Sequence, residues 1–258
     1  MDAASSSLFT LPPTAPKVRL TIVSGSGAGM SLELTRPVTF VGRRDGCKVA
    51  LNHPKVFAVH AAVVHTGEDV YLRDLTGKET TFHNDLKAIC ERLAHGDTIR
   101  IASWELRVSI TGPGSPASPD EVPIIVERLD TGRTHRLSRA VAVIGRRNSS
   151  DIVVPDREVS RSHAVIFGYL DGLAICDALS KNGLKVNDKF QRFGRLTPND
   201  IVSIGPHRFK VRRGATSPAG SGSPIVREAP AEAIDDDDIM EMLMDSKADR
   251  IDIRSDKP

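Results

Sequence analysis

Aromatic residues are scarce in this sequence: they make up 4% of its 258 residues. Proteins that bind single-stranded nucleic acid by stacking need a ring for each of several bases, so we expect no nucleic-acid partner. Cysteine is also rare, because Cys47, Cys90 and Cys176 lie far apart and no C-x-x-C pair occurs. This argues against a disulfide framework or a zinc site and for a reducing compartment. We expect neither a metal nor a cofactor.

Long hydrophobic runs are missing as well. No segment approaches the ~20 apolar residues that a membrane-spanning helix needs. The N-terminal residues 1–17 lack the charged start and apolar run of a signal peptide. We therefore expect a soluble, cytoplasmic protein that does not contact a membrane.

The net charge of +2 hides an uneven distribution. Residues 225–258 contain 11 acidic and 5 basic residues, whereas the rest of the chain contains 22 acidic and 30 basic residues. A mildly basic body with an acidic tail suits anionic ligands. It does not reach the basic stripe typical of nucleic-acid-binding proteins.

The sequence repeats itself at a constant offset of 103 residues. The triplet Gly42-Arg43-Arg44 aligns with Gly145-Arg146-Arg147, and His60 aligns with His163. Further identical pairs are Gly29/Gly132, Leu34/Leu137, Asp74/Asp177, Asn84/Asn187 and Asp97/Asp200. An offset held over about 80 residues predicts two tandem copies of one fold.

Segments rich in Pro, Gly and Ser follow each copy and predict linkers. We therefore divide the chain into an N-terminal disordered tail (1–15), a first domain (16–112), a linker (113–120), a second domain (121–213), and a disordered linker with an acidic tail (214–258). Short apolar runs separated by turn residues predict an all-β sandwich or barrel for each copy. Leu86–Asp97 could form a helix alone, but its counterpart contains Gly194 and Pro198, so we expect a loop or strand.

Four motifs follow one another in the second copy: Gly145-Arg146, Ser160-Arg161-Ser162-His163, Ser180-Lys181-Asn182-Gly183 and Asn199-Asp200-Ile201-Val202-x-Ile204-Gly205. Their order resembles the forkhead-associated (FHA) domain, whose signature is G-R, S-R-x-H, S-x-N-G and a late G-D-x-I-x-I-G. The resemblance implies an eleven-stranded β-sandwich that binds phosphothreonine peptides through loops at one end. By the repeat, it implies the same fold for the first copy.

The resemblance also implies roles for individual residues. The ligand-binding positions are Arg146, Ser160, Arg161, Ser180, Lys181 and Asn182, and the loop-shaping positions are Gly145, His163 and Gly183. These residue types suit a phosphate dianion, because a guanidinium gives it strong, charge-assisted and often bidentate hydrogen bonds. In a strand the side chain of Arg147 would point away from that of Arg146.

The first copy lacks most of these polar residues. The segment "KVFAVHAAV" replaces "EVSRSHAVI", so that Phe57 stands for Ser160 and Ala58 for Arg161. Gly77 replaces Ser180, and Glu79 replaces Asn182. Positions that shape the fold remain, whereas a phenylalanine cannot donate to phosphate. We therefore expect the first copy to be degenerate.

Other interpretations of these motifs are weaker. Ser160, His163 and Asp177 could be taken for a hydrolase triad, but no G-x-S-x-G elbow is present. The counterparts of His163 and Asp177 also persist in the copy that lacks the serine, which indicates structural roles. For Arg146, the alternative is a solvated surface arginine. The glycine-rich Ser24–Met30 lacks a phosphate-loop pattern and predicts a hairpin turn.

The acidic segment 234–253 carries Ile239, Met242 and Leu243 at helical spacing after the run Asp235–Asp238. It predicts either a solvated tail or a helix that docks on a second partner. The whole sequence thus predicts a non-enzymatic adaptor that binds a threonine-phosphorylated protein in kinase signalling. The alternative is a phosphate-independent scaffold that uses both sandwiches for assembly.

Overall fold

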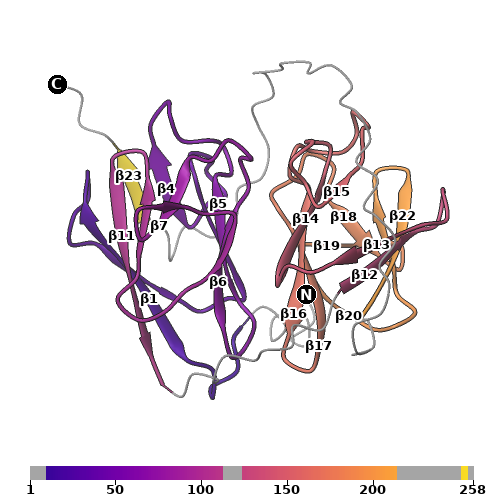
Figure 1. Cartoon of the computed structure of the whole chain (residues 1–258), viewed down its shortest axis with the longest axis horizontal. Helices are drawn as coiled ribbons and strands as arrows, with labels where there is room; N and C mark the ends of the chain where they lie inside the picture. Colours follow the sequence, from indigo (N-terminus) through magenta and orange to yellow (C-terminus); the bar gives the residue numbers. More distant parts are fainter. Residues whose placement is uncertain (1–9, 113–123, 214–250, 255–258) are drawn as a thin grey trace.

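The computed structural model describes residues 10–112, 124–213 and 251–254. All regular elements in these ranges are β-strands, which confirms the all-β prediction. Within them, no helix has the length and apolar character needed to cross a membrane. The strands form two sandwiches that lie side by side (Figure 1).

Each sandwich contains eleven strands, the number that the resemblance implied. The first sandwich consists of β1 (Lys17–Ser24), β2 (Ser31–Leu34), β3 (Val38–Gly42), β4 (Val49–Asn52), β5 (Ala61–His65), β6 (Val70–Asp74), β7 (Thr81–His83), β8 (Leu86–Lys87), β9 (Cys90–Arg92), β10 (Thr98–Ile101) and β11 (Trp104–Thr111). The second consists of β12 (Ile124–Arg128), β13 (Arg133–Leu137), β14 (Val141–Gly145), β15 (Ile152–Val153), β16 (Ala164–Tyr169), β17 (Gly172–Asp177), β18 (Leu184–Val186), β19 (Lys189–Gln191), β20 (Phe193–Leu196), β21 (Ile201–Ile204) and β22 (His207–Arg213).

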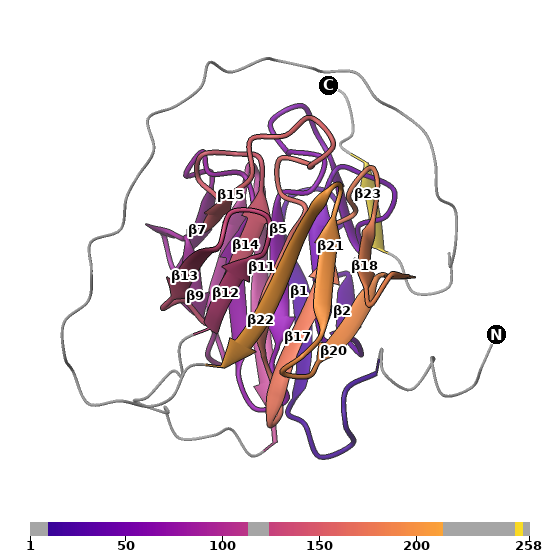
Figure 2. The same cartoon turned by 90° about the vertical axis from the view of Figure 1, so that its right-hand side faces the viewer.

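The two sandwiches share one topology. One sheet of the first sandwich has the order β2-β1-β11-β10-β7-β8, and the corresponding sheet of the second has the order β13-β12-β22-β21-β18-β19. The other sheets contain β4-β3-β5-β6-β9 and β15-β14-β16-β17-β20. In Figure 2 the sheet of the second sandwich that contains β12 and β22 lies nearest the viewer. Strands β3 and β14, β7 and β18, and β10 and β21 are offset by 103 residues at both ends, as the repeat predicts.

Two local predictions are also confirmed. Leu86–Asp97 contains the short strands β8 and β9 in place of a helix. The glycine-rich Ser24–Met30 forms the turn of the β1–β2 hairpin, since these two strands pair in antiparallel fashion.

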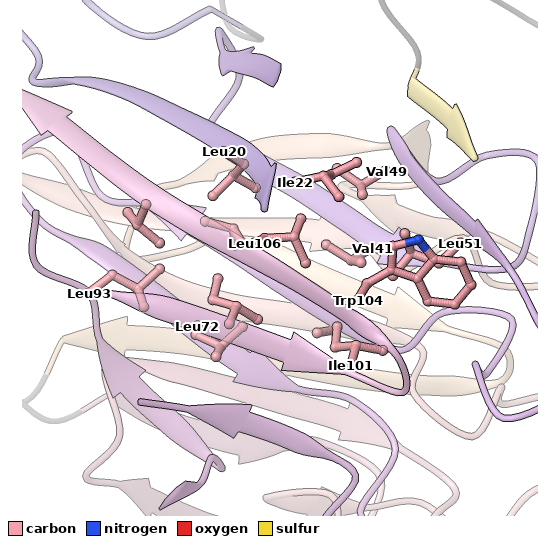
Figure 3. Packing of buried hydrophobic residues seen from close by; sticks show 14 of the residues in the cluster. Leu20, Ile22, Val41, Val49, Leu51, Leu72, Leu93, Ile101, Trp104 and Leu106 are labelled. Carbon is pink, nitrogen blue, oxygen red and sulfur yellow. The ribbon is translucent and has the colours of Figure 1, made fainter. Parts of the chain in front are cut away.

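Each sandwich encloses its own hydrophobic core. In β1, alternate residues Val18, Leu20 and Ile22 are buried, as expected for a strand with one face on the core. Trp104 is the largest fully buried side chain, and it lies against the other core residues of the first sandwich (Figure 3). Fully burying an aliphatic or aromatic side chain of this kind contributes about 1.5–3 kcal/mol.

A third apolar cluster joins the two sandwiches. Its members from the first sandwich are Phe40, Cys47, Ala62, Val64 and Leu75, and those from the second are Val141, Val143, Val165, Phe167, Tyr169, Ala174, Cys176, Ala178 and Phe193. Most of these residues belong to the sheet that contains β5 and the sheet that contains β16. The two sheets face each other in Figure 1. The central strands β5 and β14 are therefore buried on both faces.

An ion pair is buried at the same interface. Arg73 Nη2 of β6 lies 2.7 Å from Asp151 Oδ2, and their side chains are 2% and 6% exposed. Such a pair requires both partners, because removing one leaves an uncompensated charge away from water.

Contacts at one end of the interface are reciprocal. Arg44 Nη1 donates to the backbone oxygen of Leu179 at 2.5 Å. Its aligned counterpart, Arg147, donates through Nη1 to the backbone oxygen of Leu75 at 3.2 Å. The second arginine of each Gly-Arg-Arg triplet thus binds the loop after β6 or β17 of the other sandwich. The sandwiches therefore pack much as the subunits of a two-fold symmetric dimer do.

A last strand, β23 (Ile251–Arg254), joins the first sandwich from the C-terminal part of the chain. It pairs in parallel with β4, so that Ile251 is opposite Val49 and Arg254 is opposite Asn52. These four residues lie within the segment for which we expected disorder. The acidic run Asp235–Asp238 and the apolar stripe after it lie outside the described residues.

Candidate functional site

His163 connects loops at one end of the second sandwich through hydrogen bonds that we call the loop framework. Its Nδ1 accepts a hydrogen bond from the backbone N–H of Ser160 at 3.0 Å, and its Nε2 donates to the backbone oxygen of Gly183 at 2.9 Å. Burial lowers the pKa of His163, so the imidazole is neutral and the two bonds select one tautomer. The ring thereby connects the loop of Ser160 to the loop of Gly183.

Gly145 allows a third loop to cross close to these two. Arg146 N donates to the backbone oxygen of Ser160 at 3.0 Å, and Arg147 N donates to that of Arg161 at 3.2 Å. A Cβ atom at Gly145 would lie 2.1 Å from the Arg161 oxygen, so a side chain cannot be accommodated there. Gly42 has the same constraint in the first sandwich, which explains why both copies contain glycine before the arginine pair.

The loop after β17 is shaped by Asp177 and Ser180. The hydroxyl of Ser180 donates to Asp177 Oδ1 and accepts the backbone N–H of Gly183 at 2.9 Å. Burial raises the pKa of Asp177, and the hydrogen bonds from Ser180 oppose that rise. Because the single hydroxyl proton of Ser180 binds Asp177, this side chain holds the loop and has no proton left for a ligand.

Hydrogen bonds then connect the loops to one another. Lys181 N donates to Ser160 Oγ at 3.1 Å, and Asn182 Nδ2 donates to the backbone oxygen of Glu158 at 2.9 Å. Ser160 Oγ acts as an acceptor here, and its own hydrogen has no acceptor within the described parts of the chain. A hydroxyl donor is therefore free at the point where the three loops meet.

A cluster of positive charge surrounds this hydroxyl. The half-buried Arg146 makes no side-chain hydrogen bond or ion pair to any residue that the structure describes. Burial lowers the pKa of Arg147, and the nearby charges of Arg161 and Arg146 lower it further, whereas Asp74 raises it. Arg161 and Lys181 are exposed on the flanking loops. Mutual repulsion among these cations favours binding of an anion between them.

The arrangement differs from a catalytic triad. The Ser160 hydroxyl contacts the backbone of Lys181, and His163 Nδ1 already accepts the backbone N–H of Ser160. Among residues 10–112, 124–213 and 251–254, no group of His, Cys, Asp or Glu side chains could hold a metal ion.

In the first sandwich, the aligned framework is present. His60 Nδ1 accepts the backbone N–H of Phe57 at 3.1 Å, and Arg43 N donates to the Phe57 oxygen at 2.9 Å. Arg43 and Ala58 are exposed. Glu79 forms a solvent-exposed ion pair with Lys87, which lowers the pKa of the Glu79 carboxyl.

Two of the altered positions in the first sandwich contact the second sandwich. The ring of Phe57 lies 5.7 Å from the guanidinium carbon of Arg147. Gly77 lies beside Ser149, so that a Cβ at position 77 would be 1.9 Å from its hydroxyl oxygen. A cavity of ≈ 210 Å³ opens next to these contacts, and its lining includes Arg73, Glu79, Arg139, Ser149 and Ser162.

Sequence reasoning missed this interface. Its signal was the uninterrupted apolar character of β5 and β16, which is typical of strands buried on both faces.

Comparison with known families gives two matches. Residues 39–102 match the family model described as the FHA domain, which supports an FHA domain in the first sandwich. Residues 125–214 match the model described as the inner membrane component of T3SS, cytoplasmic domain. The FHA model therefore matches the sandwich in which Phe57, Ala58, Gly77 and Glu79 stand at the positions of Ser160, Arg161, Ser180 and Asn182. The matched range extends from β3 to the end of β10 and includes the framework that both copies share.

Individual relatives cover only part of the chain. The transcriptional regulatory protein EmbR of Mycobacterium bovis is 29% identical over 115 residues, which are 44% of this chain and 30% of EmbR. EmbR of Mycobacterium tuberculosis matches equally well. This chain thus spans less than a third of these relatives.

Two solved structures are also similar. EmbR of Mycobacterium tuberculosis in complex with a low-affinity phosphopeptide is 29% identical, with a TM-score of 0.35, over 41% of this chain and 28% of that chain. The FhaA FHA domain complexed with the intracellular domain of Rv3910 is 29% identical, with a TM-score of 0.33, over 34% of this chain and 99% of that chain.

Proposed function

We propose that this protein is a non-enzymatic adaptor whose second sandwich binds a phosphothreonine-containing segment of a partner protein. The observation that carries the proposal is the guanidinium of Arg146, which has no partner in the described chain. It lies on a loop that is hydrogen-bonded to the loop of Ser160. The FHA match in the first sandwich supports the same function class.

Each polar side chain has a distinct role in this proposal. Arg146 binds the phosphate through two N–H groups, and the free hydroxyl hydrogen of Ser160 donates to a third oxygen. The exposed Arg161 and Lys181 add positive charge at the rim. Asn182 holds the peptide backbone through its side-chain oxygen, because its Nδ2 already binds Glu158. Ser180, in contrast, acts only on the loop.

We assign no phosphate binding to the first sandwich. We interpret the two sandwiches as a tandem duplication in which the first copy is degenerate. Arg43 is retained, but Phe57 offers no donor and Glu79 would repel a phosphate. The shared framework of His60 and Gly42 keeps the fold without requiring a ligand.

The full-length chain should be titrated with a degenerate pool of phosphothreonine peptides and with the same pool after phosphatase treatment. We expect saturable binding of the phosphorylated pool and at least about tenfold weaker binding of the treated pool, since one charge-assisted hydrogen bond contributes ~1.5–3 kcal/mol. Equal binding of both pools would instead support a phosphate-independent scaffold. The large apolar interface between the sandwiches is compatible with that second function.

A further inference from the structure

The phosphothreonine site of the second sandwich is held from outside by the first sandwich. We propose that the first sandwich is a positioning element, which fixes the loops that carry Arg146 and Ser160 in their ligand-binding arrangement. This inference rests on the proposed function and adds to it: the degenerate copy acts on the ligand site of its neighbour although it binds no phosphate itself.

One backbone oxygen of the first sandwich connects both loops. The oxygen of Leu75, in the loop after β6, accepts a hydrogen bond from Ser162 Oγ at 2.8 Å and another from Arg147 Nη1 at 3.2 Å. Ser162 lies two residues after Ser160, and Arg147 directly follows Arg146. The carbonyl group of Leu75 therefore fixes the spacing between the two loops that bear the phosphate ligands.

The loop of Arg146 is anchored to the first sandwich at its other end too. This loop runs from β14 to β15 and ends at Asp151, whose Oδ2 accepts both the buried Arg73 at 2.7 Å and the backbone N–H of Val143 at 2.7 Å. The loop is thus held at Arg147 and at Asp151, and Arg146 directly precedes the first of these two anchors.

Two further contacts with the first sandwich complete the support. The guanidinium of Arg147 lies over the ring of Phe57, and Phe57 is the residue that aligns with Ser160. Gly77, which aligns with Ser180, lies against Ser149 in the middle of the loop. Two positions at which the first copy lost its phosphate ligands are therefore the positions that touch the neighbouring loop. Holding a loop in its bound conformation increases affinity because less conformational entropy is lost on binding.

Gly77→Ala tests the proposal from the first sandwich, at a residue to which we assign no ligand contact. Its Cβ would lie 1.9 Å from Ser149 Oγ and 2.4 Å from Ser149 Cβ, so the loop that carries Arg146 must shift. We expect phosphothreonine peptides to bind the full-length Gly77→Ala variant about tenfold more weakly, which corresponds to ~1.4 kcal/mol. Adding Ser149→Gly removes both clashing atoms and should restore most of the affinity.

A matched control separates the clash from backbone strain. Gly77 has φ +60, so alanine is strained there whatever the space around it. Gly96 has φ +92 and would place its Cβ in open space, with no atom within 4 Å. Gly96→Ala therefore introduces similar strain in the first sandwich without touching the second, and we expect its affinity to stay within about twofold of the wild type.

Ser162→Ala provides a second test that does not depend on how Gly77→Ala folds. Removing its hydroxyl breaks the bond to Leu75 and should weaken phosphopeptide binding about three- to tenfold. Ser162→Thr keeps a hydroxyl and should restore the affinity. Melting temperatures measured in parallel should fall in both Gly77→Ala and Gly96→Ala, whereas only Gly77→Ala should lose affinity.

The outcomes distinguish this inference from the proposed function. Wild-type binding together with unchanged affinity in Gly77→Ala and Ser162→Ala would overturn the positioning role alone. If Ser149→Gly does not restore binding in the Gly77→Ala background, the loss of affinity comes from backbone strain at position 77. That result would also overturn the positioning role. A wild-type chain without phosphate-dependent binding would overturn both.

Discussion

Arg146→Ala is the most direct test of the ligand site. In the absence of ligand the half-buried guanidinium makes no hydrogen bond or ion pair to the described residues, so its removal breaks no polar interaction within them. We therefore expect the free energy of unfolding to stay within about 0.5 kcal/mol of the wild type. The entire effect should fall on binding.

The size of that effect follows from the contacts the guanidinium can make. One hydrogen bond to a charged group contributes about 1.5–3 kcal/mol, which corresponds to roughly a 10- to 150-fold loss of affinity. A bidentate contact to phosphate makes two such bonds, so the upper part of this range is expected. Ser160→Ala removes one neutral hydroxyl donor and should cost about the lower limit.

Fluorescence anisotropy with a labelled pool of phosphothreonine peptides would measure these affinities in the full-length chain. Arg157→Ala is the matched control, because Arg157 is an exposed arginine on the loop before Ser160 and its removal changes the net charge equally. Arg147→Ala is unsuitable as a control, since Arg147 contacts Leu75 and Phe57 of the first sandwich. Equal losses in Arg146→Ala and Arg157→Ala would refute the shaped pocket and indicate attraction by diffuse charge.

Three further predictions concern the first sandwich and the interface. Arg43→Ala should leave phosphopeptide affinity unchanged in the same titration, because the first copy has no complete site; a loss comparable to that of Arg146→Ala would contradict this. Asp151→Ala should lower the free energy of unfolding in urea by about 3–5 kcal/mol, because it leaves the buried Arg73 without its counter-ion; a loss below about 1 kcal/mol would show that water compensates. Burial lowers the pKa of His65 below its usual 6.5, so the unfolded chain binds a proton more readily and stability should fall as pH drops below that value. The free energy of unfolding in urea, measured at about pH 7.5 and about pH 5.5, checks this. It should fall less between the two pH values in His65→Gln than in the wild type.

The fold was largely predictable because its signals are local. Turn residues at regular intervals and a constant repeat offset place most strands within a few residues of their observed bounds. Phe57 stands where the second copy has Ser160, whereas the histidine three residues later is the same in both copies. This contrast predicts which positions bind ligand and which hold the loops. The histidine then has the same role in both copies, since His60 and His163 each accept a backbone N–H through Nδ1.

What escaped prediction depends on contacts between distant segments. The sequence does not specify that the oxygen of Leu75 binds Ser162, because a backbone carbonyl carries no residue-specific signal. The motif predicts a ligand-binding role for Ser180, and it does not specify that the Ser180 hydroxyl donates to Asp177 in the ligand-free chain. The pairing of β23 with β4 was missed because four residues in an acidic tail are too few to show a strand pattern.

The interface also offers a physical reason for the proposed assignment of phosphate binding to the second sandwich alone. Arg44 and Arg147 make equivalent contacts across it, so the framework of the pair is nearly symmetric. The symmetry breaks at the aligned pair Phe57 and Ser160. Phe57 lies beneath the arginine of the other sandwich, where an apolar ring stabilises a partly buried guanidinium. Ser160 keeps a free hydroxyl hydrogen among the loops of the second sandwich. An aromatic side chain at position 57 therefore contributes to the contact between the sandwiches, and the same substitution at position 160 would remove a ligand of the phosphate. His60 and His163 make the same backbone hydrogen bond beside either residue, so under the proposed function this one position can support the interface in the first sandwich and bind phosphate in the second.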